Sequence, residues 1–493
     1  MKLKAQDIDI ATGSTLVVIL NKKDAENFDL YALDRVMVGK GRKKTIAIVD
    51  IAERAVSAGK IGLFEEVKEA LNAKNNDLIE LSLAKKPRSV QYILKKLNGE
   101  ELNERETKEI VKDIVNNSLS EVELTYYVAA CYTKGMSMKE TTFLTKAVVE
   151  SGDRLRLKKY PVLDKHCSGG VPGNRTTMLI VPIVAAAGFT IPKTSSRSIT
   201  SAAGTADTME VLAPVNLSVD KIKEAVLKTG ACIVWGGAIS LASADEEMIR
   251  VRHPLSLDPE GMLLSSILAK KAAVNATHVL IDLPLGKDTK IKTKKQAGKL
   301  KREFSELGRK MKMEIHVIIT DGRQPIGNGI GPALEARDVL WVLKRDRRRP
   351  LDLEKKALYM ASLLLKIAGV KNSRKKAYEI LDSGFAYEKM KEIIEAQGGN
   401  PAVGPDEIPI GKFRHTYKAK KSGRIKNVDN LTIAKLARVA GAPRDKEAGL
   451  YLYKHEREKV RKGESIFTIY AKSKAKLRYA KEILREFSGI EIG

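Results

Sequence analysis

Residues Asp164 to Asp207 read DKHCSGGVPGNRTTMLIVPIVAAAGFTIPKTSSRSITSAAGTAD. Two loops rich in glycine and serine flank an apolar run, Met178 to Ile191. Small residues let backbone N–H groups approach an anion closely, and hydroxyls and cations add further donors. Two such loops at the ends of one buried segment can converge on one site, which a single loop cannot do. The stretch therefore predicts a cradle for a phosphate rather than two ordinary turns around a core helix.

We call residues 165–175 the first loop and residues 194–207 the second loop. The first loop supplies cations, a hydroxyl and glycines: Lys165, His166, Ser168, Gly169, Gly170 and Arg175. The second loop supplies mostly hydroxyls: Thr194, Ser195, Ser196, Arg197, Ser198, Thr200, Ser201, Gly204, Thr205 and Asp207.

The length of the chain, 493 residues, predicts two to four domains, and the hydrophobic content of 43% is typical of a globular protein. Lys and Arg number 88 against 61 Asp and Glu, a net charge of +27. This excess favours anionic partners such as nucleic acid, phosphorylated metabolites or acidic surfaces. Aromatic residues are only 5%, which does not support a base-stacking platform for single strands. Dense Lys and Glu also fit the surface of a thermophile protein.

Three cysteines, Cys131, Cys167 and Cys232, lie far apart without a CxxC pair. This spacing argues against a disulfide framework and a zinc site and favours a reducing cytoplasm. The N-terminal residues MKLKAQDIDI lack the apolar core of a signal peptide, and the run Met178 to Ile191 is too short to span a membrane. We expect a soluble cytoplasmic protein.

The order of patterns along the chain predicts a multidomain α/β protein. Residues 1–85 are β-rich and suit an assembly domain. Residues 86–155 are helical, and 237–272 are expected to return to that domain. Residues 156–236 and 273–398 form an α/β domain with a mainly parallel sheet that binds phosphate. Residues 399–493 mix strands and helices as a C-terminal α+β domain.

Local signals predict individual elements. Ser89 is expected to cap a helix, and the pairs Asn103/Glu106, Ser120/Glu123 and Ser137/Glu140 have the form of capping boxes. Strands are expected at 15–20, 35–38, 45–51, 78–83, 231–235, 278–282, 314–320, 423–426, 449–453 and 465–470. Helices are expected at 63–73, 219–230, 269–274, 294–312, 333–343, 353–369, 375–397, 431–440 and 475–486. The turn Gly327-Asn328-Gly329-Ile330-Gly331 is a weak signal for a nucleotide site.

Several motifs resemble those of the thymidine/pyrimidine-nucleoside phosphorylases. Lys165-His166-Cys167-Ser168-Gly169-Gly170-Val171 is similar to the KHSTGGV signature of that family. Ser195-Ser196-Arg197 with Gly204-Thr205-Ala206-Asp207 resembles its second phosphate loop, and Ser266-Ile267-Leu268-Ala269-Lys270-Lys271 resembles its SIMSKK helix. The 327–331 turn with Ala333-Leu334-Glu335 matches a further block. The 85-residue extension, GGVPGNR and PKTSSRSIT are most similar to one branch, the archaeal AMP phosphorylases.

This resemblance implies an activity. Members of the branch cleave AMP with phosphate to adenine and ribose 1,5-bisphosphate, and also accept CMP or UMP. It implies a helical domain beside an α/β domain with the active site in the cleft between them, no cofactor and no metal. It also implies homodimers, with the N-terminal domain promoting larger assemblies, and small-molecule partners rather than nucleic acid or a membrane.

The resemblance also assigns residues. Matching positions hold inorganic phosphate at Lys165, Ser168 and Ser195. Positions that contact the nucleotide match Gly170, Ser196, Arg197, Ser198, Ile199, Thr200, Ser201, Thr205, Ser266 and Lys290, and Thr205 is also expected on phosphate. Asp258 matches the proton donor, a role that requires a protonated carboxyl, which burial or a nearby anion would favour. His166 and Lys270 are candidate base contacts, and we expect Lys290 to help select a 5′-phosphate.

Two positions leave questions open. Cys167 stands where the family usually has Ser, and a thiol is a poorer donor to phosphate than a hydroxyl, so we assign it no role. Arg250 and Arg252 both flank the family's substrate arginine.

Three alternative functions remain: a nucleoside phosphorylase, an enzyme similar to anthranilate phosphoribosyltransferase (whose KHGNR motif is missing here), and a basic nucleic-acid-binding protein. Salt-dependent nanomolar binding of RNA or DNA would favour the last.

Overall fold

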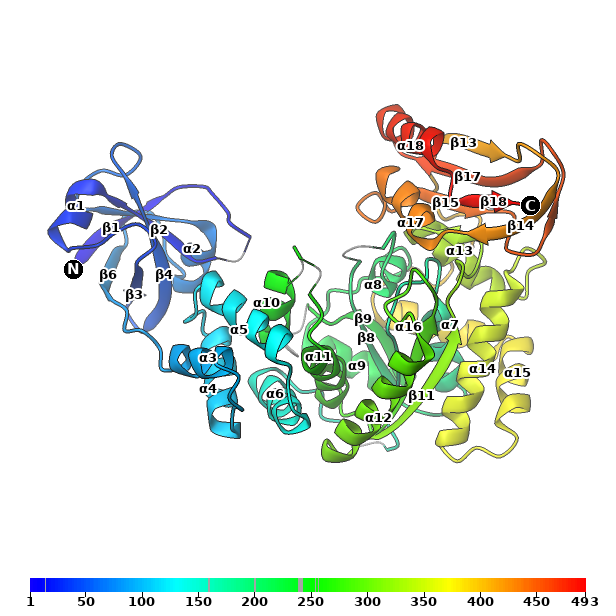
Figure 1. The fold of residues 1–493 in the computed structure, drawn as a ribbon, viewed down its shortest axis with the longest axis horizontal. Coiled ribbons are helices and arrows are strands. Elements are labelled where there is room, and N and C mark those ends of the chain that lie inside the picture. Colours follow the sequence, from blue (N-terminus) through cyan, green and yellow to red (C-terminus); the bar gives the residue numbers. More distant parts are fainter. Residues whose placement is uncertain (14, 158–159, 199–200, 238–242, 253, 256) are drawn as a thin grey trace. The chain divides into compact units, whose positions relative to one another are not determined.

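The structure is a computed structural model that describes residues 1–493 except 14, 158–159, 199–200, 238–242, 253 and 256. The described chain forms two compact units. Unit 1 comprises Met1–Ser151 with Ser243–Leu263, and unit 2 comprises Gly152–Ala242 with Leu264–Gly493. Figure 1 shows the elements of each unit. The multidomain α/β fold expected from the sequence is confirmed.

The first part of unit 1 is a closed barrel with strand order β1-β5-β2-β4-β3-β6. Its strands are β1 Lys2–Asp7, β2 Val17–Asn21, β3 Arg35–Lys40, β4 Lys43–Ala52, β5 Lys60–Leu63 and β6 Leu78–Leu83, with helices α1 Lys22–Asn27 and α2 Glu65–Leu71. Val18, Leu20 and Val36 are fully buried inside it. The sequence predicted β2, β3, β4, β6 and α2. It missed β1, β5 and α1; in β1 only Leu3 and Ala5 point inward, and neither is β-branched.

The second part of unit 1 is helical. It contains α3 Ser89–Leu97, α4 Glu104–Val115, α5 Glu121–Lys134, α6 Met138–Ser151 and α10 Ser243–Arg252. Reciprocal hydrogen bonds confirm the capping boxes at Asn103/Glu106 and Ser120/Glu123, and Ser137 and Glu140 exchange the same bonds at 2.9 and 3.1 Å. The prediction for Ser89 was wrong. Ser89 is the first helical residue, the cap position is Arg88, and the buried Ser89 side chain makes no capping bond.

Unit 2 is built on parallel strands. Its strands here are β7 Leu163–Cys167, β8 Ile191–Ser195, β9 Ala231–Trp235, β10 His278–Leu285 and β11 Glu314–Asp321. One sheet has the order β11-β10-β7, and β8 pairs with β9, all in parallel. A parallel bridge between Val162 and Thr190 joins β7 to β8. The expected parallel sheet is confirmed, with strand order β11-β10-β7-β8-β9.

Helices cover this sheet. They are α7 Thr176–Ala186, α8 Thr205–Met209, α9 Val219–Thr229, α11 Glu260–Ala273, α12 Lys294–Lys310, α13 Pro332–Leu343, α14 Leu351–Ile367, α15 Ser373–Asp382 and α16 Phe385–Ala396. The run that begins at Met178 forms α7, in which Thr176 to Ala185 are all buried, as expected of a helix that is apolar on every side. The single helix expected at 375–397 is two helices, because Gly384 adopts a left-handed φ of +83° between them.

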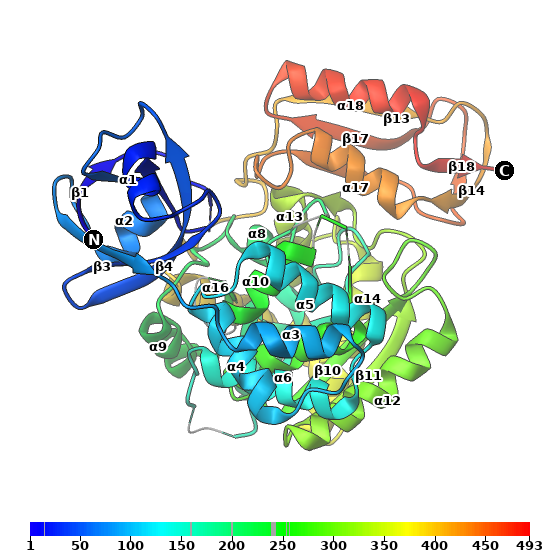
Figure 2. The same ribbon diagram turned by 60° about the vertical axis from the view of Figure 1, so that its left-hand side comes forward.

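The C-terminal domain mixes strands and helices as expected. Its elements are β12 Gly329–Ile330, β13 Phe413–Lys418, β14 Gly423–Val428, α17 Asn430–Val439, β15 Gly449–Leu452, β16 Lys459–Val460, β17 Ser465–Ala471, α18 Lys474–Glu486 and β18 Ile490–Ile492. Helices α17 and α18 pack on each other and on the sheet β12-β15-β17-β13 (Figure 2). Strand β13 was not predicted, because its sequence FRHTYK contains two cations and a histidine.

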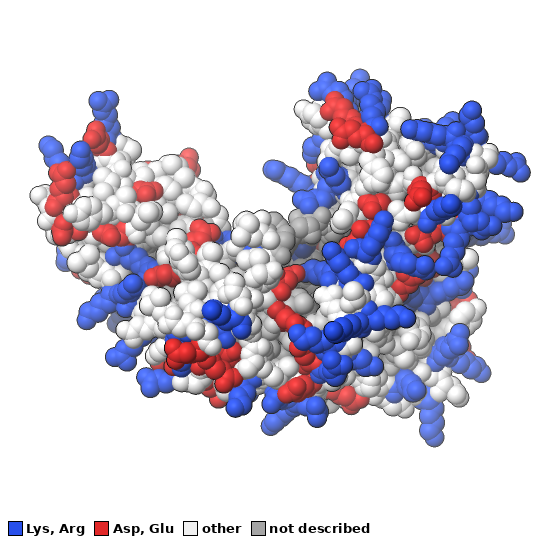
Figure 3. Space-filling model, in the orientation of Figure 1, with Lys and Arg blue, Asp and Glu red and all other residues white. Residues whose placement is uncertain are grey.

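Positive charge gathers over the C-terminal domain, as Figure 3 shows. Residues 399–493 contain 22 Lys and Arg against 11 Asp and Glu, so they contribute +11 of the total charge of +27. The charge is therefore less even along the chain than the overall composition suggests. Among the described residues, no helix has both the length and the apolar character needed to cross a lipid bilayer.

Candidate active site

The sheet order brings the two loops to one edge. Strands β7 and β8 are parallel neighbours, and the backbone N–H of Leu163 donates to Thr190 O at 2.8 Å. The first loop leaves the carboxyl end of β7 and the second loop leaves the carboxyl end of β8. The chain order reverses between β7 and β10, which makes this edge a topological switch point. Open parallel sheets bind ligands outside the strand ends at such points.

Gly170 lets the first loop approach the turn that follows β10. Its φ is +88°, and a Cβ there would lie 2.7 Å from Thr289 Cα and 3.2 Å from the backbone N of Lys290. Only glycine tolerates both the conformation and the contact. The first loop and the 286–291 turn are therefore in direct backbone contact.

Lys165 and Ser168 present donors without acceptors. The Lys165 side chain is 1% exposed and its Nζ donates one hydrogen bond, to Thr176 Oγ1 at 3.1 Å. An ammonium has three donors, so two have no acceptor among the described residues. The Ser168 Oγ is buried and also lacks a partner there, while its backbone N–H donates to Asp282 O at 3.0 Å. Buried polar groups normally pair, so these donors make Lys165 and Ser168 candidates for binding an anion.

A short polar chain connects Lys165 to Cys167. Thr176 Oγ1 donates to Asn174 Oδ1 at 3.0 Å, and Asn174 Nδ2 donates to Cys167 Sγ at 3.4 Å. Burial and the carboxylate of Asp282 raise the pKa of the Cys167 thiol. Cys167 is therefore a neutral thiol that accepts a weak hydrogen bond.

Asp207 and Glu210 organise the second loop. The Asp207 carboxylate accepts from the backbone N–H groups of Ser198 and Gly204, at 2.7 and 2.8 Å. The Arg197 guanidinium donates to both Glu210 oxygens and lies 5.0 Å from the Trp235 ring centroid. Arg197 holds the pKa of Glu210 down at about 2. The predicted contacts Ile199 and Thr200 lie outside the described residues.

The hydroxyl residues of the second loop differ in exposure. Ser198 Oγ and Ser201 Oγ lie 3.1 Å apart, and Ser201 Oγ donates to Ala203 O at 3.1 Å. Ser195 is half-buried at the end of β8, where its carbonyl accepts from Gly236 N at 3.0 Å, and Ser196 is exposed. The loop is thus held mainly by its own side chains.

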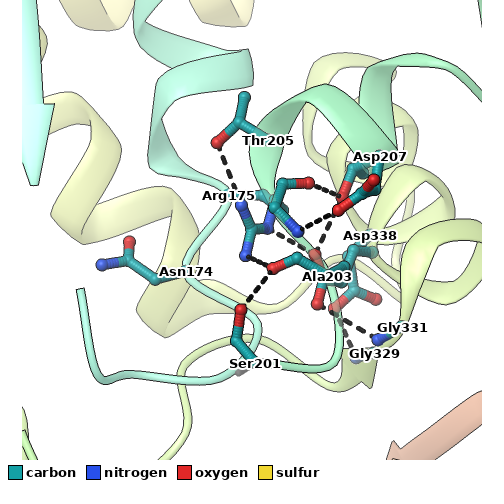
Figure 4. A network of polar contacts seen from close by, with 12 residues as sticks. Asn174, Arg175, Ser201, Ala203, Thr205, Asp207, Gly329, Gly331 and Asp338 are labelled. Atoms are coloured by element: carbon teal, nitrogen blue, oxygen red, sulfur yellow. Dashed lines mark hydrogen bonds and ion pairs between the residues drawn. The ribbon is translucent and has the colours of Figure 1, made fainter. Parts of the chain in front are cut away.

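Arg175 joins the two loops, as Figure 4 shows. Its Nη1 donates to Thr205 Oγ1 at 2.9 Å and its Nη2 donates to Ala203 O at 2.8 Å. Its Nε pairs with the carboxylate of Glu335 on α13. Arg175 therefore ties the end of the first loop to Thr205 and Ala203 of the second loop, and the adjacent Thr176 contacts Lys165.

Several lysines lie around His166 of the first loop. Burial and four lysines hold the pKa of His166 well below its ordinary value, so its imidazole is neutral. The four are Lys271, Lys193, Lys165 and Lys270. Two of these lysines also lie near the fully buried Asp164. Lys271 Nζ is 2.8 Å from its carboxylate, and Lys193 Nζ is 3.9 Å from it. The two candidate base contacts therefore lie close enough for the charge of Lys270 to lower the pKa of His166.

The remaining predicted residues come from three other segments. Ser266 is buried and Lys270 half-buried on α11, while Lys290 is exposed on the turn after β10. Asp258 is exposed and belongs to unit 1, whereas both loops belong to unit 2.

The two candidate arginines have different surroundings, both within unit 1. Arg250 pairs with Glu121 and Glu247, each at 2.9 Å. Arg252 is 6% exposed, and its Nη1 is buried without a hydrogen-bond partner among the described residues. Arg252 therefore differs from Arg250 in having a whole guanidinium nitrogen buried without a partner among the described residues.

The glycine-rich turn 327–331 does not form a nucleotide site. Its backbone N–H groups are taken by carboxylates. Gly327 N donates to Asp352, Asn328 N and Gly329 N donate to Asp338 Oδ2 at 2.7 Å, and Gly331 N donates to Glu335 at 3.1 Å. Burial raises the pKa of Asp338 to about 7. The turn is a structural joint between α13 and β15, which β12 pairs with.

Sequence patterns missed the supporting polar residues. Glu335 and Asp282 stand in apolar segments, ALEA and HVLID, where a charge is unusual. A charged residue inside a buried segment is the signal that would have singled them out. Their partners, Arg175 and Lys356, are distant in sequence, so the pairs themselves are not visible there.

Three family models match the chain. Residues 90–152 match the helical bundle domain of the glycosyl transferase family, and residues 159–258 match its a/b domain. Residues 424–491 match the C-terminal domain of pyrimidine nucleoside phosphorylase.

Curated relatives match the whole chain. The AMP phosphorylase of Thermofilum pendens is 45% identical over 493 residues, covering 100% of this chain and 95% of that protein. The AMP phosphorylase of Thermococcus kodakarensis is also 45% identical, covering 100% of this chain and 98% of that protein. Anthranilate phosphoribosyltransferase from Thermus thermophilus has a TM-score of 0.51 at 19% identity, over 62% of this chain and 98% of that chain, which shows a shared fold. The full-length similarity and the matching domain order show that this chain belongs to the AMP phosphorylase family.

Proposed function

We propose that this protein catalyses the phosphorolysis of nucleoside 5′-monophosphates, with AMP and phosphate giving adenine and ribose 1,5-bisphosphate. The observation that carries the proposal is that Lys165, with two of its three N–H donors, and Ser168, with its hydroxyl, have donors without an acceptor among the described residues at the switch point of the sheet. Full-length identity of 45% to AMP phosphorylases supports the same substrate class. CMP and UMP are proposed as further substrates.

Phosphorolysis needs an anion held at the anomeric carbon. Lys165, Ser168 and Ser195 are proposed to bind inorganic phosphate, with the Thr205 hydroxyl as a further donor. Gly170, the 196–201 segment, Ser266 and Lys290 are proposed to contact the nucleotide. Preorganised donors of this kind stabilise the developing charge and hold the reactants in line, which are large contributions to catalysis.

The reaction forms one bond and breaks one. A phosphate oxygen bonds to C1′ as the glycosidic C1′–N bond breaks, and the base leaves with the electron pair of that bond. A proton then has to reach the base nitrogen, and Asp258 is proposed to give it. His166 is neutral and is proposed to face the base together with Lys270.

Lys290 is proposed to help select the 5′-phosphate. It is exposed, and its backbone lies against Gly170 of the first loop. Lys290→Ala should reduce the preference for AMP over adenosine, measured as the ratio of kcat/KM values. The neighbouring exposed Lys292 provides the control, because Lys292→Ala should leave that ratio unchanged. An unchanged ratio in Lys290→Ala would remove Lys290 from this role.

A nucleoside phosphorylase is the second candidate, because residues 424–491 match the C-terminal domain of pyrimidine nucleoside phosphorylase. The test supplies phosphate with AMP, CMP, UMP, adenosine or thymidine and measures free base and sugar phosphate. Preference for the nucleotides supports the proposal, and preference for the nucleosides supports the second candidate.

We further propose a cytoplasmic homo-oligomer with a dimer as its building block. The three cysteines are free, which suits a reducing compartment. Larger assemblies are proposed to form through the N-terminal barrel, which exposes Phe28, Tyr31 and Leu33 close together in sequence, the last two 67% and 77% exposed. Light scattering tests this, because Tyr31→Ser with Leu33→Ser should reduce the mass to that of the dimer.

A further inference from the structure

Arg175 is a buried arginine whose carboxylate partner, Glu335, is also buried. Arg175 is 8% exposed and is the last residue of the first loop, at the N-cap of α7. Two of its nitrogens reach the second loop, at Thr205 Oγ1 and Ala203 O, at 2.9 and 2.8 Å. A planar guanidinium fixes several partners at once, which an ammonium cannot do.

Glu335 holds the Nε of Arg175, the guanidinium nitrogen that does not contact the second loop. It is 1% exposed on α13 and pairs with Arg175 Nε. The same carboxylate accepts from Thr208 Oγ1 at 2.9 Å and from Gly331 N at 3.1 Å. Glu335 therefore ties Arg175, helix α8 and the glycine-rich turn into one rigid cluster.

The contact with Arg175 determines what the Thr205 hydroxyl can do. Because Arg175 Nη1 donates to Thr205 Oγ1, one lone pair of that oxygen is used. A hydroxyl also carries one proton to donate, and no acceptor for it lies among the described residues. The Thr205 hydroxyl is thereby kept as a donor, the form that an anion requires.

The residues on either side of Arg175 serve the first loop. Thr176 Oγ1 accepts from Lys165 Nζ at 3.1 Å and donates to Asn174 Oδ1 at 3.0 Å. The segment Asn174-Arg175-Thr176 thus contacts Lys165 on one side and Thr205 on the other. One short piece of chain sets the geometry of both anion-binding groups.

We propose that Arg175, held by Glu335, is a positioning residue that fixes the Thr205 hydroxyl as a phosphate donor at a set place relative to Lys165. This inference rests on the proposed function, since it takes the anion to be the attacking phosphate. We assign Arg175 to positioning rather than to anion binding because each of its three guanidinium nitrogens already has a partner within the chain, which leaves two of its five N–H donors.

The test compares four variants of the full chain. Arg175→Lys keeps the charge but cannot span all three partners, and Glu335→Gln keeps the shape but removes the ion pair. Thr205→Val removes the hydroxyl that Arg175 is proposed to position. Glu354→Gln is a matched control, because Glu354 is 7% exposed and pairs with Arg345 and Arg349 at 2.6 and 2.7 Å, outside both loops.

Two measurements separate positioning from simple stability. The first is KM for phosphate in AMP phosphorolysis. The second is the rise in Tm caused by inorganic phosphate alone, which reports phosphate binding without any turnover. Arg175→Lys and Glu335→Gln should raise KM for phosphate at least tenfold and shrink the phosphate-induced Tm rise. Glu354→Gln should lower Tm by a similar amount yet leave both values unchanged.

The double variant Arg175→Lys with Thr205→Val gives the decisive comparison. If both residues act through one hydroxyl, it should bind phosphate no worse than Thr205→Val alone. Multiplying effects, or unchanged phosphate binding in Arg175→Lys, would overturn the inference. If the wild type binds phosphate but does not cleave AMP, the proposed function fails while the phosphate-induced Tm rise still decides this inference.

Discussion

Arg197 and Glu210 form a bidentate ion pair at the second loop, in which Arg197 Nη1 and Nη2 donate to the two carboxylate oxygens at 2.8 and 2.6 Å. Lys446 Nζ lies 3.0 Å from the same carboxylate. The Arg197 side chain is thus committed to holding the loop.

Glu210→Gln should loosen the second loop without unfolding the protein. The pair is partly exposed, so the free energy of unfolding should fall by only about 0.5–1 kcal/mol. KM for the nucleotide should rise several-fold, measured by initial rates at saturating phosphate. The pKa of Glu210 is lowered to about 2, so the stability from this pair is complete above the ordinary carboxyl pKa and is lost only as pH falls toward 2. A KM equal to that of the wild type would show that the pair does not shape the nucleotide site.

Ser168→Ala should separate function from stability. The Ser168 hydroxyl is buried without a partner among the described residues, and burying an unsatisfied hydroxyl costs about 1–3 kcal/mol, so its removal should leave Tm unchanged or raise it. KM for phosphate should rise at least tenfold because a donor is lost. Ser89→Ala is the control, since Ser89 Oγ in α3 is also buried and unpartnered. A fall in Tm together with an unchanged KM would mean that Ser168 is structural.

Asp258→Asn should slow the chemical step. Losing a general acid typically costs 10²- to 10⁴-fold in rate, so kcat for AMP should fall by about that factor while KM for phosphate changes little. Asp50→Asn, at an exposed position of the barrel, should retain wild-type kcat. Retention of more than a tenth of kcat in Asp258→Asn would exclude it as the proton donor.

Asp338 should make stability fall as pH rises. An unfolded aspartate loses its proton near pH 4, but burial raises the pKa of folded Asp338 to about 7. Between these values the folded state holds the extra proton, so stability decreases with pH by at most about 1.4 kcal/mol per unit. In Asp338→Asn this slope should disappear, because an amide does not titrate. The fold should be kept, because the amide oxygen can still accept from Asn328 N and Gly329 N. Denaturant titrations of both proteins at pH 5 to 8 measure it, and parallel curves would contradict the assignment.

The sequence predicted strands β9, β10 and β11 and the two loops because their signals are local, but it did not predict β7 and β8. Runs such as ACIVW and HVLID are short and apolar, and they became β9 and β10. The Gly and Ser content of residues 165–207 marked the strand ends where the loops lie. The capping boxes of α4 and α5 were visible for the same reason, since both partners lie three residues apart.

Long-range pairs could not be predicted from the sequence. Arg175 and Glu335 are 160 positions apart, and only the packing of α13 beneath α8 brings their charges together. The glycine-rich turn misled in the opposite way. Its composition suits an anion, but carboxylates from α13 and α14 occupy its amides. Strand β13 was hidden because its charged side chains obscure the apolar alternation.

Phosphorolysis of AMP is the central claim, and one assay tests it directly. Purified protein is incubated with AMP with and without inorganic phosphate, and adenine and the sugar product are quantified. The account predicts adenine release that requires phosphate and yields ribose 1,5-bisphosphate in equal amount. Release that does not depend on phosphate, or cleavage of adenosine and thymidine but not AMP, would contradict it.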